Sequence, residues 1–148
     1  MRLRASVLLI AVAAAVAASS PMTAQTTRGS ATDRAPVIRP GQTTRGTLTD
    51  DDVELFDDAP AARWRIAGHR GDHLRIRMAS ADFEPFVSLI RHAGGRDVVV
   101  AYRSAARATT GALIDATLPA DGEYVIEATV LEPDARGAYQ LTIEPARR

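Results

Sequence analysis

The sequence predicts an all-β protein, an antiparallel β-sandwich of about eight strands. Three observations favour this fold. Apolar and polar residues alternate in most segments after residue 41, which is the period of a half-buried strand. Turn-forming residues recur about every 8 to 12 positions, a spacing typical of sandwiches and barrels. Beyond the first 24 residues, no segment combines apolar residues at helical spacing with a helix cap, so helices are not expected.

The N-terminus has the composition of a secretory signal peptide. Arg2 and Arg4 precede an apolar run over residues 5–18, which is too short to span a bilayer comfortably. Small residues precede two candidate cleavage points, after Ala18 and after Ala24. We therefore expect export of the chain to the periplasm or to the extracellular space.

Three segments are expected along the chain. Residues 1–24 form the signal peptide. Residues 25–40 contain few large apolar side chains and are expected to be a disordered, solvated leader. Residues 41–145 form one β-sandwich domain, and a chain of this length buries about two-thirds of the surface that it exposes when unfolded.

The composition excludes several classes of function. The chain has no cysteine, so disulfides, a lipid-modified N-terminal cysteine and thiol catalysis are excluded. All 18 basic residues are arginines, and loss of Arg2 and Arg4 leaves 16 against 18 acidic residues. These arginines are scattered rather than clustered around aromatic residues, so nucleic acid is not an expected partner. No membrane span is expected after removal of the signal.

The first strand is expected at residues 42–48, and an acidic loop at residues 49–60 follows it. In the next strand Trp64 alternates with Arg63 and Arg65. Because successive side chains of a strand point to opposite faces, this pattern places the tryptophan in the core and both arginines on the solvent side.

The following strand has the same pattern. After a turn at residues 67–72, apolar residues at positions 74, 76 and 78 alternate with Arg75 and Arg77. Because the two strands are consecutive and joined by a short turn, they are expected to pair as neighbours. The remaining strands are expected at residues 86–90, 98–102, 112–118, 123–130 and 138–144, with a tight turn at Gly94-Gly95.

The last two strands begin alike. Gly122 and Gly137 are each followed two positions later by a tyrosine, Tyr124 and Tyr139. Glycine permits the positive φ of a turn, and a tyrosine at the start of a strand favours a corner closed by its hydroxyl group. Both tyrosines are therefore expected to hold strand corners.

Residues 41–144 contain a series of short motifs: Gly41-Gln42-Thr43, Gly46-Thr47-Leu48, Trp64-Arg65-Ile66, the stretch from Ala67 to Leu74, Ser80-Ala81-Asp82-Phe83-Glu84-Pro85-Phe86, Leu118-Pro119-Ala120-Asp121-Gly122-Glu123-Tyr124 and Gly137-Ala138-Tyr139-Gln140-Leu141. In their order and spacing, these motifs resemble those of the bacterial pre-peptidase C-terminal domain.

This resemblance implies a jelly-roll-like β-sandwich, similar to the collagen-binding modules of secreted collagenases. Such domains usually follow a secreted peptidase, and they are removed during maturation or help the enzyme to engage an insoluble polymer. No peptidase precedes the module here, so a free-standing exported copy is expected. The chain departs from the family pattern at Glu84, where aspartate is common, and at Arg103-Ser104-Ala105, where an acidic pair is common. Calcium at that second loop is therefore not expected.

The acidic loop has two interpretations. It holds six carboxylates between residues 50 and 58, and calcium prefers six to eight oxygen ligands. Asp51, Asp52, Asp57 and Asp58 are the candidate ligands of a stabilising calcium ion. The alternative is a solvated loop whose charge discourages pairing between sheet edges. No cofactor other than calcium is indicated.

Catalytic patterns are missing from the sequence. It contains neither the HExxH pattern of zinc proteases nor the GxSxG turn of serine hydrolases. Asp82 and Glu84 form a close carboxylate pair that a glycosidase would use as acid and nucleophile. Their place before Pro85 favours another role, in which they anchor a turn by accepting hydrogen bonds from backbone amides. The sequence therefore predicts that the protein is not an enzyme.

A binding surface is expected on the solvent side of the strands. If the second and third strands are neighbours, Arg63, Arg65, Arg75 and Arg77 form one cationic patch suited to carboxylates. The alternative is an ordinary solvated face. Tyr102 is the tyrosine most suited to an exposed contact, and its alternation partners are valines.

The leading hypothesis is an exported, non-catalytic binding or accessory domain that engages an extracellular polymer or an envelope or secreted protein. A structural or maturation role, in which the domain acts like a chaperone for a secreted enzyme or an envelope assembly, is the second hypothesis. A hydrolase is the third.

Overall fold

The computed structural model describes residues 34–52, 59–105 and 111–144, and these form a two-layered antiparallel β-sandwich. The predicted signal peptide and both candidate cleavage points lie outside the described residues. Within them, no helix has the length and apolar character needed to cross a membrane. The strands are β1 (Thr43–Leu48), β2 (Ala61–Gly68), β3 (His73–Ala79), β4 (Pro85–Ala93), β5 (Arg96–Ser104), β6 (Gly111–Thr117), β7 (Gly122–Val130) and β8 (Gly137–Ile143), with a short 3-10 turn, η2 (Asp50–Asp52), after β1.

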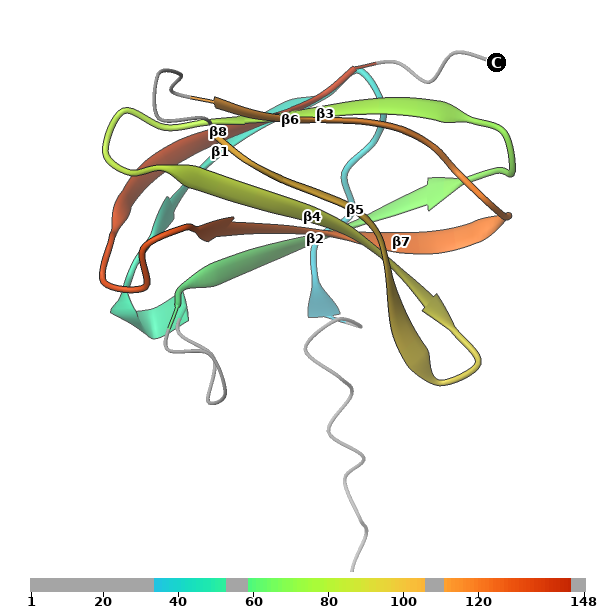
Figure 1. The fold of residues 1–148 in the computed structure, drawn as a ribbon, viewed down its shortest axis with the longest axis horizontal. Helices are drawn as coiled ribbons and strands as arrows, with labels where there is room; N and C mark the ends of the chain where they lie inside the picture. The colour runs from blue at the N-terminus through green and yellow to red at the C-terminus, as the bar shows by residue number, and fades with distance from the viewer. Residues whose placement is uncertain (1–33, 53–58, 106–110, 145–148) are drawn as a thin grey trace, which may run out of the picture.

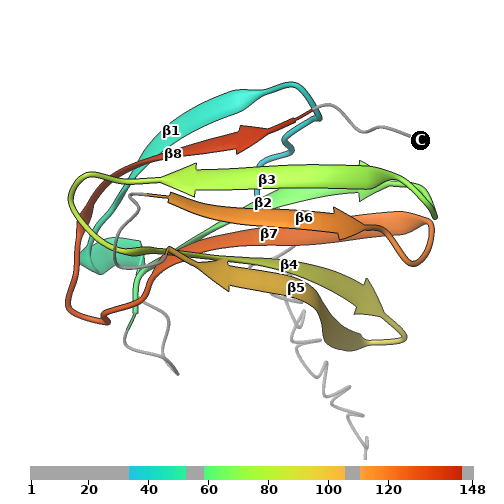
Figure 2. The ribbon, with the colours of Figure 1, turned by 45° about the horizontal axis from the view of Figure 1, so that its top comes forward.

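Two four-stranded sheets face each other, and every pairing between strands is antiparallel (Figures 1 and 2). One sheet has the order β1-β8-β3-β6, and we call it the β3 sheet. The other has the order β2-β7-β4-β5, and we call it the β2 sheet. In Figure 1 the β4–β5 hairpin, drawn in olive and yellow, projects beyond the other strands of the sandwich. The predicted number of strands and the predicted sandwich are confirmed.

The predicted pairing of the second and third strands is wrong. β2 pairs with β7, whereas β3 pairs with β6 and β8 in the opposite sheet. The turn between them carries the chain from one layer to the other and is held there by Leu118. Its N–H donates to the carbonyl of Asp72, and its carbonyl accepts from the N–H of Gly71. Alternation identifies the buried face of a strand, but it does not identify the neighbour.

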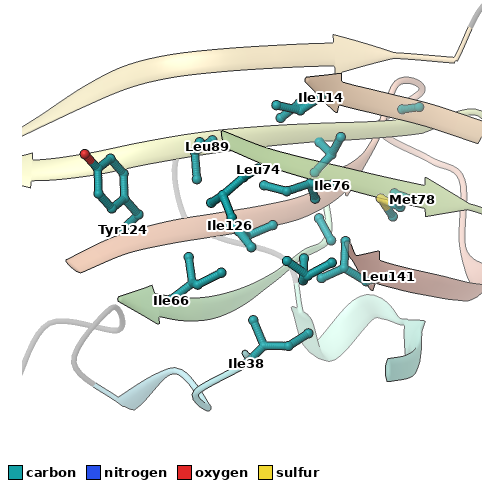
Figure 3. Close-up of a cluster of buried hydrophobic side chains, with 14 of the residues drawn as sticks. Ile38, Ile66, Leu74, Ile76, Met78, Leu89, Ile114, Tyr124, Ile126 and Leu141 are labelled. Carbon is teal, nitrogen blue, oxygen red and sulfur yellow. The ribbon is translucent and has the colours of Figure 1, made fainter. Parts of the chain in front are cut away.

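The core lies between the sheets and is built from the inward residues of both (Figure 3). In β3 the inward residues are Leu74, Ile76 and Met78, which are fully buried as the alternation predicts. Trp64 of β2 is half-buried and packs against this cluster, so its predicted inward orientation is confirmed. The larger contributors from other elements are Ile38, Leu48, Ile66, Leu89, Ile114, Tyr124, Ile126 and Leu141.

The segment before residue 41 is part of the fold, which corrects the expectation of a solvated leader up to residue 40. Ile38 is only 3% exposed and belongs to the core. Its N–H donates to the carbonyl of Arg65, and the N–H of Arg65 donates to the carbonyl of Pro36, both at 2.8 Å. Val37 and Arg65 form a parallel bridge. A short polar segment therefore covers the outer edge of β2 because one buried isoleucine and two backbone bonds suffice to hold it.

The two tyrosines expected to close corners behave differently. The hydroxyl of Tyr124 donates to the carbonyl of Ala120 at 2.6 Å and accepts from the N–H of the same residue at 3.3 Å, so this corner is confirmed. Tyr139 is also buried, but none of the described residues accepts a hydrogen bond from its hydroxyl. Its ring covers Gly46 so closely that a Cβ there would lie within 2.7 Å of ring atoms. The second corner prediction is therefore wrong, and Tyr139 packs over the β1 edge instead.

Candidate binding surface

The four arginines of the predicted cationic patch lie on two different surfaces. Arg63 and Arg65 belong to β2, whereas Arg75 and Arg77 belong to β3 in the opposite sheet. Both pairs point outward, so the body of the sandwich separates them. The prediction of a single patch is wrong because it depended on the wrong pairing of these strands.

Three of these arginines are neutralised by acidic partners on neighbouring strands. Arg63 Nη2 lies 2.8 Å from Glu127 Oε2, and Arg65 Nη1 lies 3.4 Å from Glu123 Oε2. Arg75 binds Asp115 at 3.3 Å and Glu144 at 2.9 Å. In the part of the chain that the structure describes, Arg77 has no acidic partner. Most of the expected positive charge is therefore neutralised by cross-strand ion pairs within each sheet.

An apolar surface occupies the outer face of the β4–β5 hairpin. The register pairs Ser88 with Tyr102 and Ile90 with Val99, and Phe86 lies two residues from Ser88 on the same face. The rings of Phe86 and Tyr102 are stacked, with centroids 5.9 Å apart and an interplanar angle of 19°. Tyr102 is 58% exposed and Val99 is 56% exposed. We call Phe86, Ile90, Val99 and Tyr102 the hairpin patch.

A β-bulge creates this patch. The register between β4 and β5 shifts between Leu89 and Ile90, so that Val100 has no partner residue. Val99 and Tyr102, three positions apart, consequently face the same side, whereas Val100 packs against the core. The predicted exposure of Tyr102 is confirmed, but its neighbour on the surface is Val99 and not Val100. Nothing in the sequence marks the bulge, and the patch residues Phe86, Ile90 and Val99 were therefore missed.

The arginines of the β4–β5 hairpin have no acidic partners among the described residues, and the register places them on the face opposite to the hairpin patch. Arg91, Arg96 and Arg103 lie on β4 and β5, and the acid within this hairpin, Asp97, lies 2.8 Å from Nδ1 of His92. Arg103 donates from Nη1 to the carbonyl of Tyr102 at 2.6 Å, which leaves its positive charge uncompensated. The hairpin therefore carries the hairpin patch on one face and an excess of positive charge on the other.

The outer face of the β3 sheet is more polar. Thr43 bonds to Thr142, and Arg45 donates to Gln140 at 3.4 Å. Beside this pair lies an open groove of about 600 Å³, lined in part by the small residues Ala79, Ala81 and Ala138, with Arg45 and Gln140 at its rim. No large hydrophobic residue of this sheet is strongly exposed in the described part of the chain.

Of Asp82 and Glu84, the carboxylate pair considered for catalysis, Asp82 has a structural role. Asp82 Oδ2 accepts a hydrogen bond from the N–H of Ala138 at 2.8 Å. Ser80 Oγ donates to the carbonyl of the same residue at 2.8 Å and accepts from the N–H of Asp82 at 3.0 Å. The interpretation of Asp82 as a turn anchor is confirmed.

The acidic loop is only partly within the described residues. Asp57 and Asp58 lie outside them, while Asp51 is exposed and Asp52 Oδ2 accepts from the N–H and hydroxyl of Thr49. Where the structure describes the chain, no group of three or more metal-binding side chains comes together. Calcium binding at this loop stays a prediction.

Comparison with known proteins identifies the fold. No protein-family model matches the sequence, and no curated protein matches it significantly. Among solved structures, the pre-peptidase C-terminal domain of a Bacillus anthracis collagenase is similar, with a TM-score of 0.58 and 15% identity over 74% of this chain and 94% of that one. The chain has the fold of a pre-peptidase C-terminal domain. The predicted resemblance is thus confirmed as a likeness of fold.

A second solved protein has a fold similar to that of this chain. PliG of Salmonella Typhimurium, a periplasmic inhibitor of g-type lysozyme, matches with a TM-score of 0.50 and 11% identity over 76% of this chain and 99% of its own. The matched regions cover 94% of the collagenase domain and 99% of PliG.

Proposed function

We propose that this protein is an exported, non-catalytic binding or accessory domain that engages an extracellular polymer or an envelope or secreted protein through the hairpin patch. The observation that carries the proposal is the pair Val99 and Tyr102, both more than half exposed on one face of one hairpin. Large apolar side chains exposed together on a folded domain often mark an interaction site. Neither residue is needed to fill the core.

The solved neighbours support a binding or accessory role. One is a domain of a collagenase, and the other is a periplasmic protein that inhibits a lysozyme. The second example is a protein of this fold whose role is to act on another protein outside the cytoplasm. Together with the signal-like N-terminus, it supports a secreted or periplasmic location for this chain.

The predicted binding residues divide between the two faces, and the proposal keeps those on the β2 sheet. Across that sheet, Arg63 pairs with Glu127, Glu127 with Ser88, and Ser88 with Tyr102, so Arg63 and Tyr102 lie on one row of the outer face. Adjacent strands are about 4.8 Å apart, which separates the two Cα atoms by about 14 Å. Arg63 and Arg65 therefore form a far rim of the surface, while Arg75 and Arg77 belong to neither the patch nor its rim.

Photo-crosslinking in intact cells tests this proposal. A photoreactive phenylalanine analogue at Val99 is expected to yield a discrete covalent adduct with an envelope or secreted component. The same analogue at Thr43, on the outer face of the β3 sheet, is the matched control and is expected to yield none. Adducts at Thr43 but not at Val99, or at neither position, would contradict the proposal.

A further inference from the structure

The outer face of the β3 sheet carries two exposed arginines, one on each side of β8. The register aligns Arg45 with Gln140 and Ala79 in one row of the sheet. Arg77 lies two residues before Ala79 on β3, in the next row of the same face. Two strand spacings and a two-residue step separate the Cα atoms of Arg45 and Arg77 by about 12 Å. Because arginine side chains are long, both guanidinium groups can contact one ligand that lies across β8.

The carboxylates beside these two arginines are engaged by another residue. Arg75, in the row beyond Arg77, binds both Asp115 and Glu144. Among the described residues, neither Arg45 nor Arg77 forms an ion pair. This part of the face therefore keeps two positive charges that the fold does not use, and it favours an anionic ligand.

The polar groups between the arginines add further hydrogen-bond donors. Arg45 donates from Nε to Oε1 of Gln140 at 3.4 Å, which leaves the amide NH2 of Gln140 and the Nη atoms of Arg45 without a partner in the described residues. Thr43 and Thr142 share one hydrogen bond of 3.1 Å between their hydroxyl groups, so the second hydroxyl proton stays available. The face thus presents mainly donors, which suit the oxygens of carboxylates.

The groove beside these donors has the size and the lining for a chain of sugar rings. Its volume of about 600 Å³ lies within the range of small-molecule sites, and Ala79, Ala81 and Ala138 line part of it. Side chains this small allow a flat ring to approach the backbone. Thr47 and Gln140 line the groove as well and can exchange hydrogen bonds with sugar hydroxyl groups.

Two other classes of partner match this face poorly. In the described part of the chain it exposes no large hydrophobic side chain strongly, so it lacks the apolar anchor that a protein partner usually needs. Tyr139 lines the groove but is only 4% exposed, and its ring therefore offers little surface for a neutral sugar to stack on. Charge is the main remaining source of affinity, which favours an acidic sugar chain over a neutral one.

We propose that this groove, together with Arg45 and Arg77, binds a polysaccharide whose sugar residues carry carboxylates. The site lies on the face opposite to the hairpin patch and does not depend on it. Carboxylates repeat along such a chain, so different sugar residues can meet the two arginines. Ion pairs at an exposed site are screened by salt, and the affinity is therefore expected to fall as salt is added.

Oligogalacturonate, an acidic oligosaccharide, tests the proposal against the whole mature protein labelled with ¹⁵N. At millimolar concentration it is expected to shift the amide signals of residues 45–47, 79–81 and 138–140, and added salt is expected to reverse the shifts. Its fully methyl-esterified form has the same sugar chain without the negative charges and is expected to bind about tenfold more weakly or less. Absence of the shifts, or equal affinity for the two forms, would overturn the inference.

Substitutions at five exposed positions sharpen the test. In the double variant Arg45→Gln and Arg77→Gln, the affinity is expected to fall by about tenfold, since two exposed charge contacts are lost. Arg96→Gln and Arg103→Gln remove the same number of charges from the β4–β5 hairpin and are expected to leave the affinity unchanged. Ala138→Phe keeps both arginines but fills the groove, and it is expected to abolish the shifts. Equal losses in the two double variants, or full binding by Ala138→Phe, would contradict a site in the groove.

Polyglutamate, an acidic polypeptide, is the competing arm. If it binds the groove as tightly as oligogalacturonate when carboxylates are matched in concentration, the site responds to charge alone and the polysaccharide class is wrong. Crosslinking keeps the two proposals apart, because a polysaccharide captured at position 43 is polydisperse and gives no discrete adduct. Absence of adducts at Val99 contradicts only the proposed function, whereas absence of shifts in the groove contradicts only this inference.

Discussion

The carboxylate of Asp82 accepts a hydrogen bond from the backbone N–H of Ala138, 56 residues along the chain, at a distance of 2.8 Å. The bond ties the turn between β3 and β4 to the start of β8. Gly137 completes the arrangement, because its φ of 145° and its closeness to Asp82 leave no room for a side chain. The Ser80-Ala81-Asp82 motif and the glycine of the last strand are therefore two halves of one anchor.

Asp82→Ala is expected to lower the free energy of unfolding by about 1–2 kcal/mol, because the N–H of Ala138 loses its acceptor. Asp82→Asn keeps an acceptor oxygen and is expected to lose less. Urea denaturation followed by the fluorescence of Trp64 measures both. Glu84→Ala is the control and is expected to stay within about 0.5 kcal/mol of the wild type. Equal losses at positions 82 and 84 would contradict the anchor.

Gly137→Ala is expected to be more destabilising than Gly71→Ala. Both glycines have positive φ, so both substitutions strain the backbone by about 1–3 kcal/mol. At Gly137 the new Cβ would also lie 2.4 Å from Cβ of Asp82, whereas at Gly71 nothing lies within 4 Å. The midpoints of urea denaturation of the two variants give the comparison. A larger loss of unfolding free energy in Gly71→Ala would contradict the steric clash with Asp82.

The sequence predicts which side chains are buried far better than it predicts which strands pair. The alternation in β3 correctly places Leu74, Ile76 and Met78 inside, because any half-buried strand needs one apolar face. It does not predict that β2 lies in the other sheet, because strands of either sheet share the same alternation. The error in pairing then produced the error in the arginine patch.

The binding surface depends on features with no local sequence signal. The bulge that turns Val99 to the side of Tyr102 depends on the fit of β5 against β4. The burial of Ile38 depends on the open edge of β2, and the surrounding segment is too polar for the sequence to predict this burial. Local patterns predict which residues avoid water, whereas the path of the chain decides which exposed residues come together.

Tyr124→Phe is expected to cost about 1–2 kcal/mol of unfolding free energy. The substitution removes the buried hydroxyl that bonds the carbonyl of Ala120 and so leaves that carbonyl without this donor. Tyr102→Phe removes the same hydroxyl from an exposed ring and is expected to have an effect near zero. Thermal and urea unfolding of the two variants provide the measurement. A cost that is the same in both would contradict the corner at Tyr124.

Tyr139 is expected to ionise above the ordinary tyrosine pKa of 10.0. Burial raises the pKa of its phenol, the indole N–H of Trp64 partly offsets this, and the Asp52 carboxylate raises it further. As the pH rises, the phenol of Tyr139 loses its proton in the unfolded state before it does so in the folded state. Its contribution to the free energy of unfolding is therefore fully present below pH 10.0 and is lost as the pH rises toward the pKa of the folded state.

The phenolate absorbance of the wild type minus that of Tyr139→Phe isolates this group during a pH titration. The difference curve is expected to have its midpoint above 10.0 in the folded protein and near 10.0 in urea. Identical midpoints in the two conditions would show that the ring is accessible to water, in disagreement with its packing over Gly46.

Ile38→Ala is expected to lower the free energy of unfolding by about 2–3 kcal/mol, because this side chain is 3% exposed and fills part of the core beside β2. Val37→Ala, one position earlier in the same segment, is the matched control. Val37 is 58% exposed, so its truncation is expected to change the free energy by less than about 0.5 kcal/mol. Hydrogen exchange gives an independent measurement, since the N–H of Arg65 donates to Pro36 and is expected to exchange faster in Ile38→Ala only. If both variants match the wild type, residues 35–38 contribute nothing to the edge of β2, and the domain begins at Gly41 as its composition predicts.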